Sequence, residues 1–180
     1  LSFMRAGPLD MRLDPTRGQS CREYLAQVNE KELADAIFEL GEDRFSRRIA
    51  GAIIQSRREG RLPSTTTELA ELVVRAVPPP ARRGRIHAAT RTFQALRILI
   101  NGELEELDCL LERVILLVKP GGRVAILSFH SLEDRKAKRV FKDREGPFRP
   151  LWKKPMEADE EEIRNNPRSR SAKLRVAERK

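Results

Sequence analysis

The chain has 180 residues, of which 39% are hydrophobic, and it carries 36 Lys and Arg residues against 27 Asp and Glu residues. This size and composition are typical of a folded, soluble protein with one domain core and room for a small insertion. The net charge of +9 favours a polyanionic partner, nucleic acid first, and the longest wholly apolar run, residues 114–118, is far shorter than the roughly 20 residues that cross a bilayer.

Residues 1–18 predict a loop that leads into the first helices without contributing to the core. Gly7, Pro8 and Gly18 are mixed with charged residues, and no helical or strand period is sustained. The first residue is Leu1 rather than Met, and no leader peptide pattern is present. We therefore expect the sequence to begin inside a longer protein.

Residues 21–77 follow a helical period. Three apolar stretches are each preceded by a residue that caps helix starts, and each ends at a glycine or a proline run. The predicted helices run from Asn29 to Gly41, from Asp43 to about Gly60, and from Thr65 to the prolines at 78–80. Isolated helices of this length are unstable in water, so we expect them to pack as one small bundle.

After a loop at 78–89, apolar residues recur at steps of three or four from Phe93 to Val118. Because this phase continues through Gly102, it predicts one helix from about Arg91 to Val118, roughly 40 Å long at 1.5 Å per residue. Gly102 is expected to weaken this helix rather than to end it.

A strand and a further helix follow. Residues 124–127 and Phe129 form an almost purely apolar run, which is typical of a strand buried on both faces of a parallel sheet. Ser131, with Asp134 three residues later, predicts the start of a helix that ends near Lys142. This helix–strand–helix order is typical of doubly wound α/β folds, in which ligands bind beyond the carboxyl ends of the strands.

The C-terminal tail predicts an antiparallel hairpin at the edge of the sheet. One strand is expected at 148–154 and the other at 172–177, where apolar and polar side chains alternate. Residues 157–166 between them are acidic and polar, so they predict an exposed connection.

Two polar loops carry candidate catalytic side chains. Ser128 and His130 lie at the end of the predicted strand, where His130 could act as a general base or could equally be a structural hydrogen-bonding residue. Asp10 and Arg12 lie in the N-terminal loop, where they could line a site or simply pair with each other. Glu133 and Asp134 fall in the first turn of the next helix, where carboxylates are favoured by the helix dipole.

Basic residues gather in three segments, as a surface that tracks phosphates requires, although a charged and solvated loop remains the alternative. The segments are Arg82, Arg83, Arg85, His87, Arg91 and Arg97; then Lys136, Lys138, Arg139 and Lys142; then Arg168, Arg170, Lys173, Arg175, Arg179 and Lys180.

Two kinds of site are not encoded. Cys21 and Cys109 are far apart and lack the spacing of zinc ligands, so neither a disulfide framework nor a metal site is predicted. A glycine-rich turn that lets the backbone approach a nucleoside cofactor should follow a strand, but Gly121 and Gly122 precede one. Half of a cofactor site is therefore missing.

Four strings occur together in an order and spacing that match one family. They are GPLDMRLDPTRGQS at 7–20, ATRTFQALRILINGEL at 89–104, PGGRVAILSFHSLEDR at 120–135 and NPRSRSAKLRVAER at 166–179. The chain thereby resembles the C-terminal portion of the bacterial ribosomal RNA small-subunit (16S rRNA, cytosine-N4)-methyltransferase family, and the resemblance covers nearly its whole length.

This resemblance implies the C-terminal part of a class I, Rossmann-like α/β fold, the fold of S-adenosylmethionine-dependent methyltransferases, with an inserted small all-α domain. It divides the chain into a methyltransferase loop at 1–19, a helical substrate-recognition insertion at 20–89, and the C-terminal half of the α/β domain at 90–180. The S-adenosylmethionine site would lie mostly upstream of Leu1, so no cofactor-binding residue is assigned here, and the chain alone is expected to be inactive.

The implied reaction transfers a methyl group to the exocyclic amine of a flipped-out cytidine in 16S ribosomal RNA, in the cytoplasm. Hydrogen-bond acceptors must orient that amine, and the candidates are Ser128, His130 and Asp10. The expected RNA contacts are Arg82, Arg83, Arg85, Arg91, Arg97, Lys136 and Arg139.

Two further expectations follow. The alternative to an enzyme is a non-catalytic RNA-binding or assembly module derived from it. Because an apolar strand with an unpaired edge invites association, the isolated chain is also expected to form homo-oligomers or to be partly molten.

Overall fold

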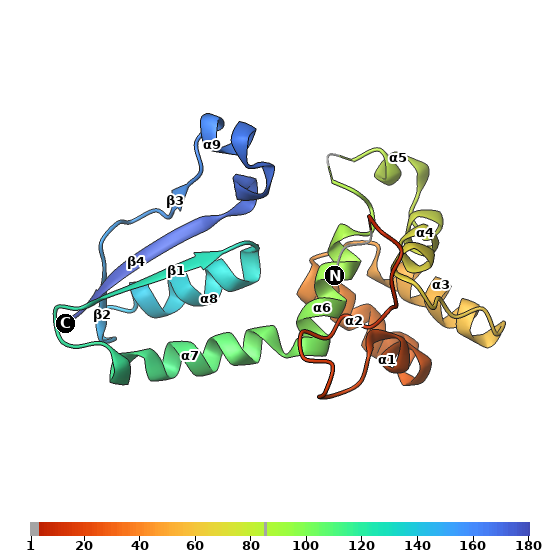
Figure 1. Cartoon of the computed structure of the whole chain (residues 1–180), viewed down its shortest axis with the longest axis horizontal. Coiled ribbons are helices and arrows are strands. Elements are labelled where there is room, and N and C mark those ends of the chain that lie inside the picture. The colour runs from red at the N-terminus through yellow and green to blue at the C-terminus, as the bar shows by residue number, and fades with distance from the viewer. Residues whose placement is uncertain (1–3, 85) are drawn as a thin grey trace. The chain divides into compact units, whose positions relative to one another are not determined.

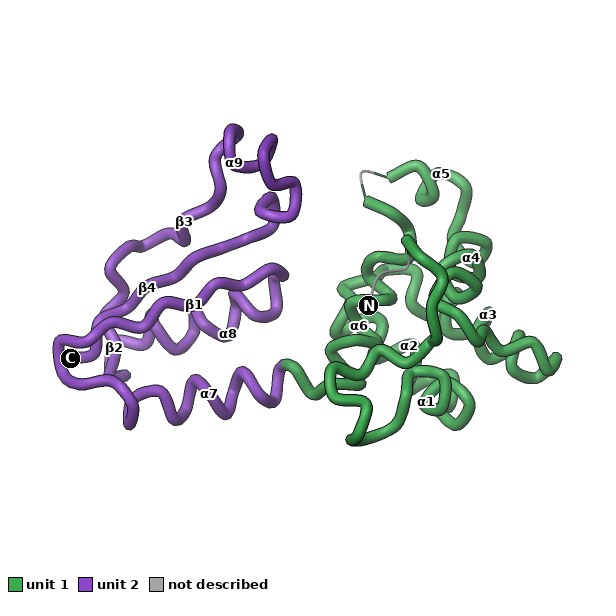
Figure 2. Tube along the Cα trace, viewed as in Figure 1, with its two compact units in different colours: residues 1–103 green, residues 104–180 purple. Residues whose placement is uncertain are grey.

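The computed structural model describes residues 4–84 and 86–180. It divides into two compact units, residues 1–103 (unit 1) and residues 104–180 (unit 2), which Figure 2 shows in different colours. In the described residues, unit 1 is built from helices and unit 2 contains the sheet (Figure 1). Arg85, one of the predicted RNA contacts, lies outside the described residues.

The helical bundle expected at 21–77 forms the greater part of unit 1. Its helices are α1 (Cys21–Gln27), α2 (Glu30–Gly41), α3 (Ser46–Arg58), α4 (Thr66–Ala76), the single-turn α5 (Pro79–Arg82) and α6 (Thr90–Asn101). Their apolar faces meet in one core, in which Leu33, Ile37, Ile49, Ile53 and Leu96 are fully buried. The bundle is confirmed, and α6 belongs to it as well.

Two of the three predicted helix starts are confirmed. Asn29 accepts a hydrogen bond from the Glu32 N–H (2.8 Å), and Thr65 forms a reciprocal capping box with Glu68. The start at Asp43 is wrong, because its carboxylate accepts the N–H of Phe45 (2.9 Å) in the preceding turn and α3 begins only at Ser46.

One helix, α1, was not predicted from the sequence. Ser20 and Glu23 form a capping box at the start of α1, with Glu23 Oε2 accepting from the Ser20 N–H (2.7 Å). The Ser-x-x-Glu signal was present in the sequence, but α1 is too short for its apolar period to be recognised.

The N-terminal segment has no regular secondary structure from Met4 to Gly18, as predicted, but it does contribute to the core. Leu9 and Met11 are 2% and 4% exposed. The Leu9 N–H donates to the Ser64 carbonyl (3.0 Å), and the Cys21 N–H donates to the Asp10 carbonyl (2.6 Å). These bonds join the loop to the starts of α4 and α1, so the expectation that it lies outside the core is wrong.

The single long helix predicted from Arg91 to Val118 is also wrong. The chain forms α6 and then α7 (Glu103–Leu117), separated by Gly102 in the left-handed region at φ 59°. Asn101 stabilises this end of α6, because its side chain accepts the Leu13 N–H (2.7 Å) and donates to the Met11 carbonyl (2.9 Å). The apolar period of the sequence continues across Gly102 and gives no sign that a helix ends there. The end of α6 is recognised only from the contacts of Asn101 with Met11 and Leu13.

Unit 2 continues from α7 through β1 (Arg123–Ser128), α8 (Ser131–Lys142), β2 (Phe148–Pro150), β3 (Met156–Glu157), α9 (Glu160–Asn165), the 3₁₀ helix η1 (Pro167–Ser171) and β4 (Lys173–Arg179). The strand order is β1-β4-β2, with β3 also paired to β4, and every described pairing is antiparallel. Gly121, at φ 76°, makes the turn into β1, and its N–H donates to the Arg179 carbonyl (2.8 Å).

The sheet is covered on one face. Val114 of α7, Phe141 of α8 and Ala177 of β4 are buried together, with Val124 and Ile126 of β1 packed against them. Along β1, the side chains in between face solvent, and Leu127 is 54% exposed. The prediction of a parallel strand buried on both faces is therefore wrong for the described residues, in which β1 is an edge strand.

The predicted antiparallel pairing within the tail is confirmed, and among the described strands β2 lies at an edge of the sheet, as expected. β2 pairs with β4 in antiparallel register, with Phe148 opposite Arg179, while β1 occupies the other side of β4. The acidic connection is exposed as expected, although it forms β3 and α9. Among the described residues, no helix is long and apolar enough to cross a membrane.

Candidate functional site

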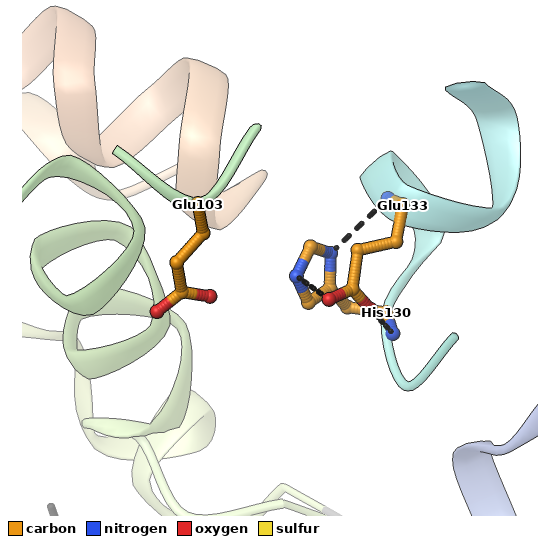
Figure 3. A group of neighbouring side chains, drawn as sticks. All are labelled: Glu103, His130 and Glu133. Atoms are coloured by element: carbon orange, nitrogen blue, oxygen red, sulfur yellow. Dashed lines mark hydrogen bonds and ion pairs between the residues drawn. The ribbon is translucent and has the colours of Figure 1, made fainter. Parts of the chain in front are cut away.

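The loop between β1 and α8 holds two of the candidate catalytic residues. His130 is the N-cap of α8: the Glu133 N–H donates to His130 Nδ1 (3.4 Å), and Glu133 Oε2 accepts from the His130 N–H (3.3 Å; Figure 3). Glu133 Oε2 also accepts from the Phe129 N–H (2.8 Å). His130 Nε2 lies 3.3 Å from Glu133 Oε1, and the imidazole is 8% exposed. The N-cap predicted at Ser131 is one residue late. The His130 imidazole, rather than the Ser131 hydroxyl, accepts the backbone hydrogen bond at the start of the helix.

Ser128, the second candidate, is held inside unit 2. It is 2% exposed, and its hydroxyl donates to the Lys173 carbonyl on the neighbouring strand (3.2 Å). Phe129 lies between these two buried residues with 52% of its surface exposed. The loop thus presents an aromatic ring on a backbone that Ser128, His130 and Glu133 hold in place.

A buried ion pair supports the same loop. Arg175 of β4 donates to both carboxylate oxygens of Asp134 (2.7 and 3.1 Å), and the two residues are 9% and 8% exposed. The bond from Arg175 holds the pKa of the Asp134 carboxyl below its ordinary value. The sequence analysis grouped Arg175 with the phosphate-contacting residues, whereas its side chain joins β4 to α8. The alternation of Arg175 with Leu174 and Val176 in the sequence predicts a strand but does not indicate this ion pair.

In unit 1, Asp10 is paired with Arg12, the plainer of the two alternatives. Asp10 Oδ1 accepts from Arg12 Nε (2.6 Å) and Oδ2 from Arg12 Nη2 (2.8 Å), which holds the pKa of Asp10 below its ordinary value. Met11 between them has a φ of 65°, which is strained for a residue with a side chain. Asp10 belongs to unit 1 and Ser128 and His130 to unit 2, and only the latter two share an element junction.

Several predicted RNA contacts have partners within unit 1. Arg82 donates to the Val77 and Arg75 carbonyls at the end of α4 (3.1 Å each), and Arg91 donates to the Glu42 carbonyl (2.9 Å). Arg97 forms a bidentate ion pair with Glu103 (2.7 and 2.8 Å). These bonds hold the guanidinium groups in place within unit 1. They do not test binding to RNA, so the RNA contacts of Arg82, Arg91 and Arg97 stay a prediction.

The other predicted contacts lie on exposed segments. Arg83 follows α5 and is exposed, while Lys136 of α8 pairs with Asp108 of α7. Arg139 lies in the last turn of α8 and is exposed. Cys21 is fully buried, which raises the pKa of its thiol to about 12 and keeps the thiol protonated near neutral pH.

Comparison with known proteins gives one consistent result. The sequence profile described as the MraW methylase family matches residues 1–180. The chain is 51% identical over 179 residues to the ribosomal RNA small subunit methyltransferase H of Sorangium cellulosum, covering 99% of this chain and 56% of that protein. The proteins of the same name from Nostoc punctiforme and Persephonella marina are 52% and 48% identical, and the match covers 58% and 61% of their lengths.

The chain therefore spans a little over half the length of the curated relatives that it matches. The predicted fold class is confirmed: a mixed helix and sheet architecture that is the C-terminal part of a class I, S-adenosylmethionine-dependent methyltransferase fold with a small all-α unit. With a profile match along all of its residues and about half of them identical to each relative, this chain belongs to the MraW methylase family.

Proposed function

We propose that the chain is part of an S-adenosylmethionine-dependent methyltransferase that methylates N4 of a cytidine in small-subunit ribosomal RNA. The observation that carries this proposal is the match to proteins named ribosomal RNA small subunit methyltransferase H along 99% of the chain. The net charge of +9 supports an RNA substrate.

We infer that no glycine turn of the described residues holds the methyl donor. A nucleoside cofactor needs a glycine turn after a strand, whereas the turn at Gly121 leads into β1 and its N–H is bonded to the Arg179 carbonyl. We therefore assign no residue of this chain to S-adenosylmethionine and expect the 180-residue chain alone to bind none.

The part of this chain in the reaction is to position the base. The amine at N4 is a poor nucleophile because its lone pair is delocalised into the ring, so alignment with the methyl group decides the rate. Ser128 and His130 are bonded within unit 2, and we assign them the role of fixing the loop after β1. Phe129, held by Glu133 and 52% exposed, is then the side chain that packs on the flipped-out cytosine.

A chimera tests the proposed function. This chain replaces the matching 179 residues of the Sorangium cellulosum protein. Radiolabelled methyl groups from S-adenosylmethionine are then followed into small-subunit ribosomal RNA, and digested nucleosides are identified by mass spectrometry. N4-methylcytidine is the expected product.

The failure of this experiment would be informative. A folded chimera that binds the donor and the RNA but transfers no methyl group would contradict the proposal and favour the non-catalytic RNA-binding module. In an active chimera, Phe129→Ala should abolish most of the transfer, whereas His130→Asn, which keeps an acceptor at the N-cap, should retain it.

A further inference from the structure

The turn between α2 and α3 separates two adjoining cavities in unit 1. One has a volume of about 420 Å³ and lies between this turn and residues at 80–84 and 86–91, among which His87 and Arg91 line it. The other, of about 290 Å³, lies between α2 and the first turn of α3 and is lined by Phe38, Arg47 and Arg48. Arg44 and Phe45 line both cavities and form the ridge between them.

The ridge is a stacked pair on a fixed support. The Arg44 guanidinium lies 4.7 Å from the centre of the Phe45 ring, within the range of a cation–π contact. Phe45 is partly buried against the core of unit 1, and its N–H is held by the carboxylate of Asp43, which is 4% exposed. The planar surfaces are therefore present before any ligand binds.

The charge around the ridge is positive. Arg44, Arg47 and Arg48 are exposed, and the bond from Arg91 to the Glu42 carbonyl holds a further guanidinium at the wall of the larger cavity. Of the acidic residues that line the two cavities, Asp35 pairs with Lys31 (2.7 Å) and Asp43 is buried. The surface is therefore suited to a polyanion.

An exposed aromatic ring completes the surface. Phe38 of α2 is 60% exposed and lines the smaller cavity. Aromatic and guanidinium planes among cations that follow a backbone are the chemistry by which proteins bind single-stranded nucleic acid. Duplex RNA does not fit this chemistry, because its bases are stacked on each other and unavailable.

We propose that the Arg44–Phe45 ridge binds unpaired nucleotides of RNA, with a base in each cavity and with Arg47, Arg48 and Arg91 on the phosphates. This inference rests on the proposed function for the choice of RNA over other polyanions. It adds residues 38–48, which lie outside the predicted basic segments, joins them to Arg91 of the first segment, and specifies the form of RNA that the surface takes.

Binding is measured on the whole 180-residue chain by fluorescence anisotropy. The probes are a labelled single-stranded oligocytidylate and an abasic strand of the same length, which keeps the phosphates but offers no base. The unchanged chain should bind the oligocytidylate more tightly. Phe45→Leu should reduce that affinity at least about fivefold, the lower end for one stacked base, and should leave the abasic affinity unchanged.

Two variants separate this effect from a loss of folding. Tyr24→Leu changes another half-buried ring packed against the same core, so it matches the packing loss and should keep the preference for bases. Arg44→Lys changes an exposed residue and retains the charge while removing the plane, so it should lower only the base-dependent affinity.

The phosphate contacts are tested by salt dependence. The double variant Arg47→Ala, Arg48→Ala should weaken binding of both probes and flatten the slope of log affinity against log salt by about 0.7 per arginine. The matched control is Arg22→Ala, Arg58→Ala, which removes the same charge from two exposed positions elsewhere in unit 1.

The inference is overturned if Phe45→Leu and Arg44→Lys keep the preference for bases, or if the two double variants have equal slopes. Failure of the unchanged chain to bind the oligocytidylate also overturns it. Methyl transfer by the chimera is measured separately, so loss of this inference leaves the proposed function open to its own test.

Discussion

The two units of the chain bury their apolar residues to different degrees. In unit 1, α2, α3, α4 and α6 each direct a fully buried apolar face into a shared core, and even the N-terminal loop contributes to it. In unit 2, the buried apolar cluster is small and lies on one face of the sheet, while Leu116, Leu117 and Phe129 are 80%, 78% and 52% exposed. Helical periodicity in one stretch of chain can specify a complete core, whereas a strand has two faces and two edges to cover.

The largest effect should appear when the units are separated. Residues 1–103 should show a sharp thermal transition that does not depend on concentration, because their core is complete. Residues 104–180 should melt broadly or associate through the edge of β1. Circular dichroism and sedimentation at several concentrations measure both. A sharp, concentration-independent transition of residues 104–180 would remove the distinction between the units.

Removing one member of the buried ion pair should have the next largest effect. Arg175→Met leaves Asp134 buried without its partner, which should cost about 3–5 kcal/mol of the free energy of unfolding of unit 2. The chain has one tryptophan, Trp152, so its fluorescence reports on unit 2 alone. Changing Asp134 to Leu in the same chain should recover most of the loss. If the single variant is as stable as the parent, the pair is not a structural support.

The ion pair also predicts a dependence on pH. The pKa of Asp134 is depressed in the folded state, so the stability that it contributes is present above its ordinary pKa of 3.8 and is lost as the pH falls below that value. The Trp152 transition of the parent should therefore weaken below about pH 4 more than that of Asp134→Asn. If the stability of the parent and of Asp134→Asn changes equally with pH, the ion pair contributes nothing to the pH dependence.

A smaller effect is expected at the boundary between α6 and α7. Gly102→Ala places a side chain at φ 59° and should cost about 1–2 kcal/mol. Gly7→Ala is the control, since a methyl group there meets no atom within 4 Å and the backbone is not left-handed. Chemical denaturation of the whole chain measures both. A stabilising effect of Gly102→Ala would show that the continuous helix, as predicted from the sequence, is accessible.

The smallest effect should be at the N-cap of α8. His130→Ala should cost about 1 kcal/mol, and His130→Asn should restore it, because asparagine is a good N-cap residue. The Trp152 transition again reports the result. Equal stability of the alanine and asparagine variants would show that the imidazole does not act as the cap.

The sequence predicted elements that depend on neighbouring residues. The caps at Asn29 and Thr65, and the strand and helix on either side of the loop at 129–130, are set by residues a few positions apart. The family was predicted from four long strings in order, and the profile match along residues 1–180 confirms it. In each case the signal was local or was repeated many times.

What the sequence did not predict depends on residues far apart in the chain. The end of α6 depends on the bonds of Asn101 to Met11 and Leu13, and the role of Arg175 depends on Asp134 of α8. For the candidate site, the burial of Ser128 was hidden because its partner, the Lys173 carbonyl, carries no sequence signal.

Hydrogen exchange followed by mass spectrometry on the 180-residue chain, with and without the single-stranded oligocytidylate, tests the central claim most directly. That claim is that unit 1 has a complete core and carries the RNA-binding ridge. The account predicts the slowest exchange in α2, α3 and α6, fast exchange in β1 and β4, and RNA-dependent protection at residues 38–48 and 86–91. Equal protection of both units, or RNA-dependent protection confined to residues 136–142 of α8, would contradict it.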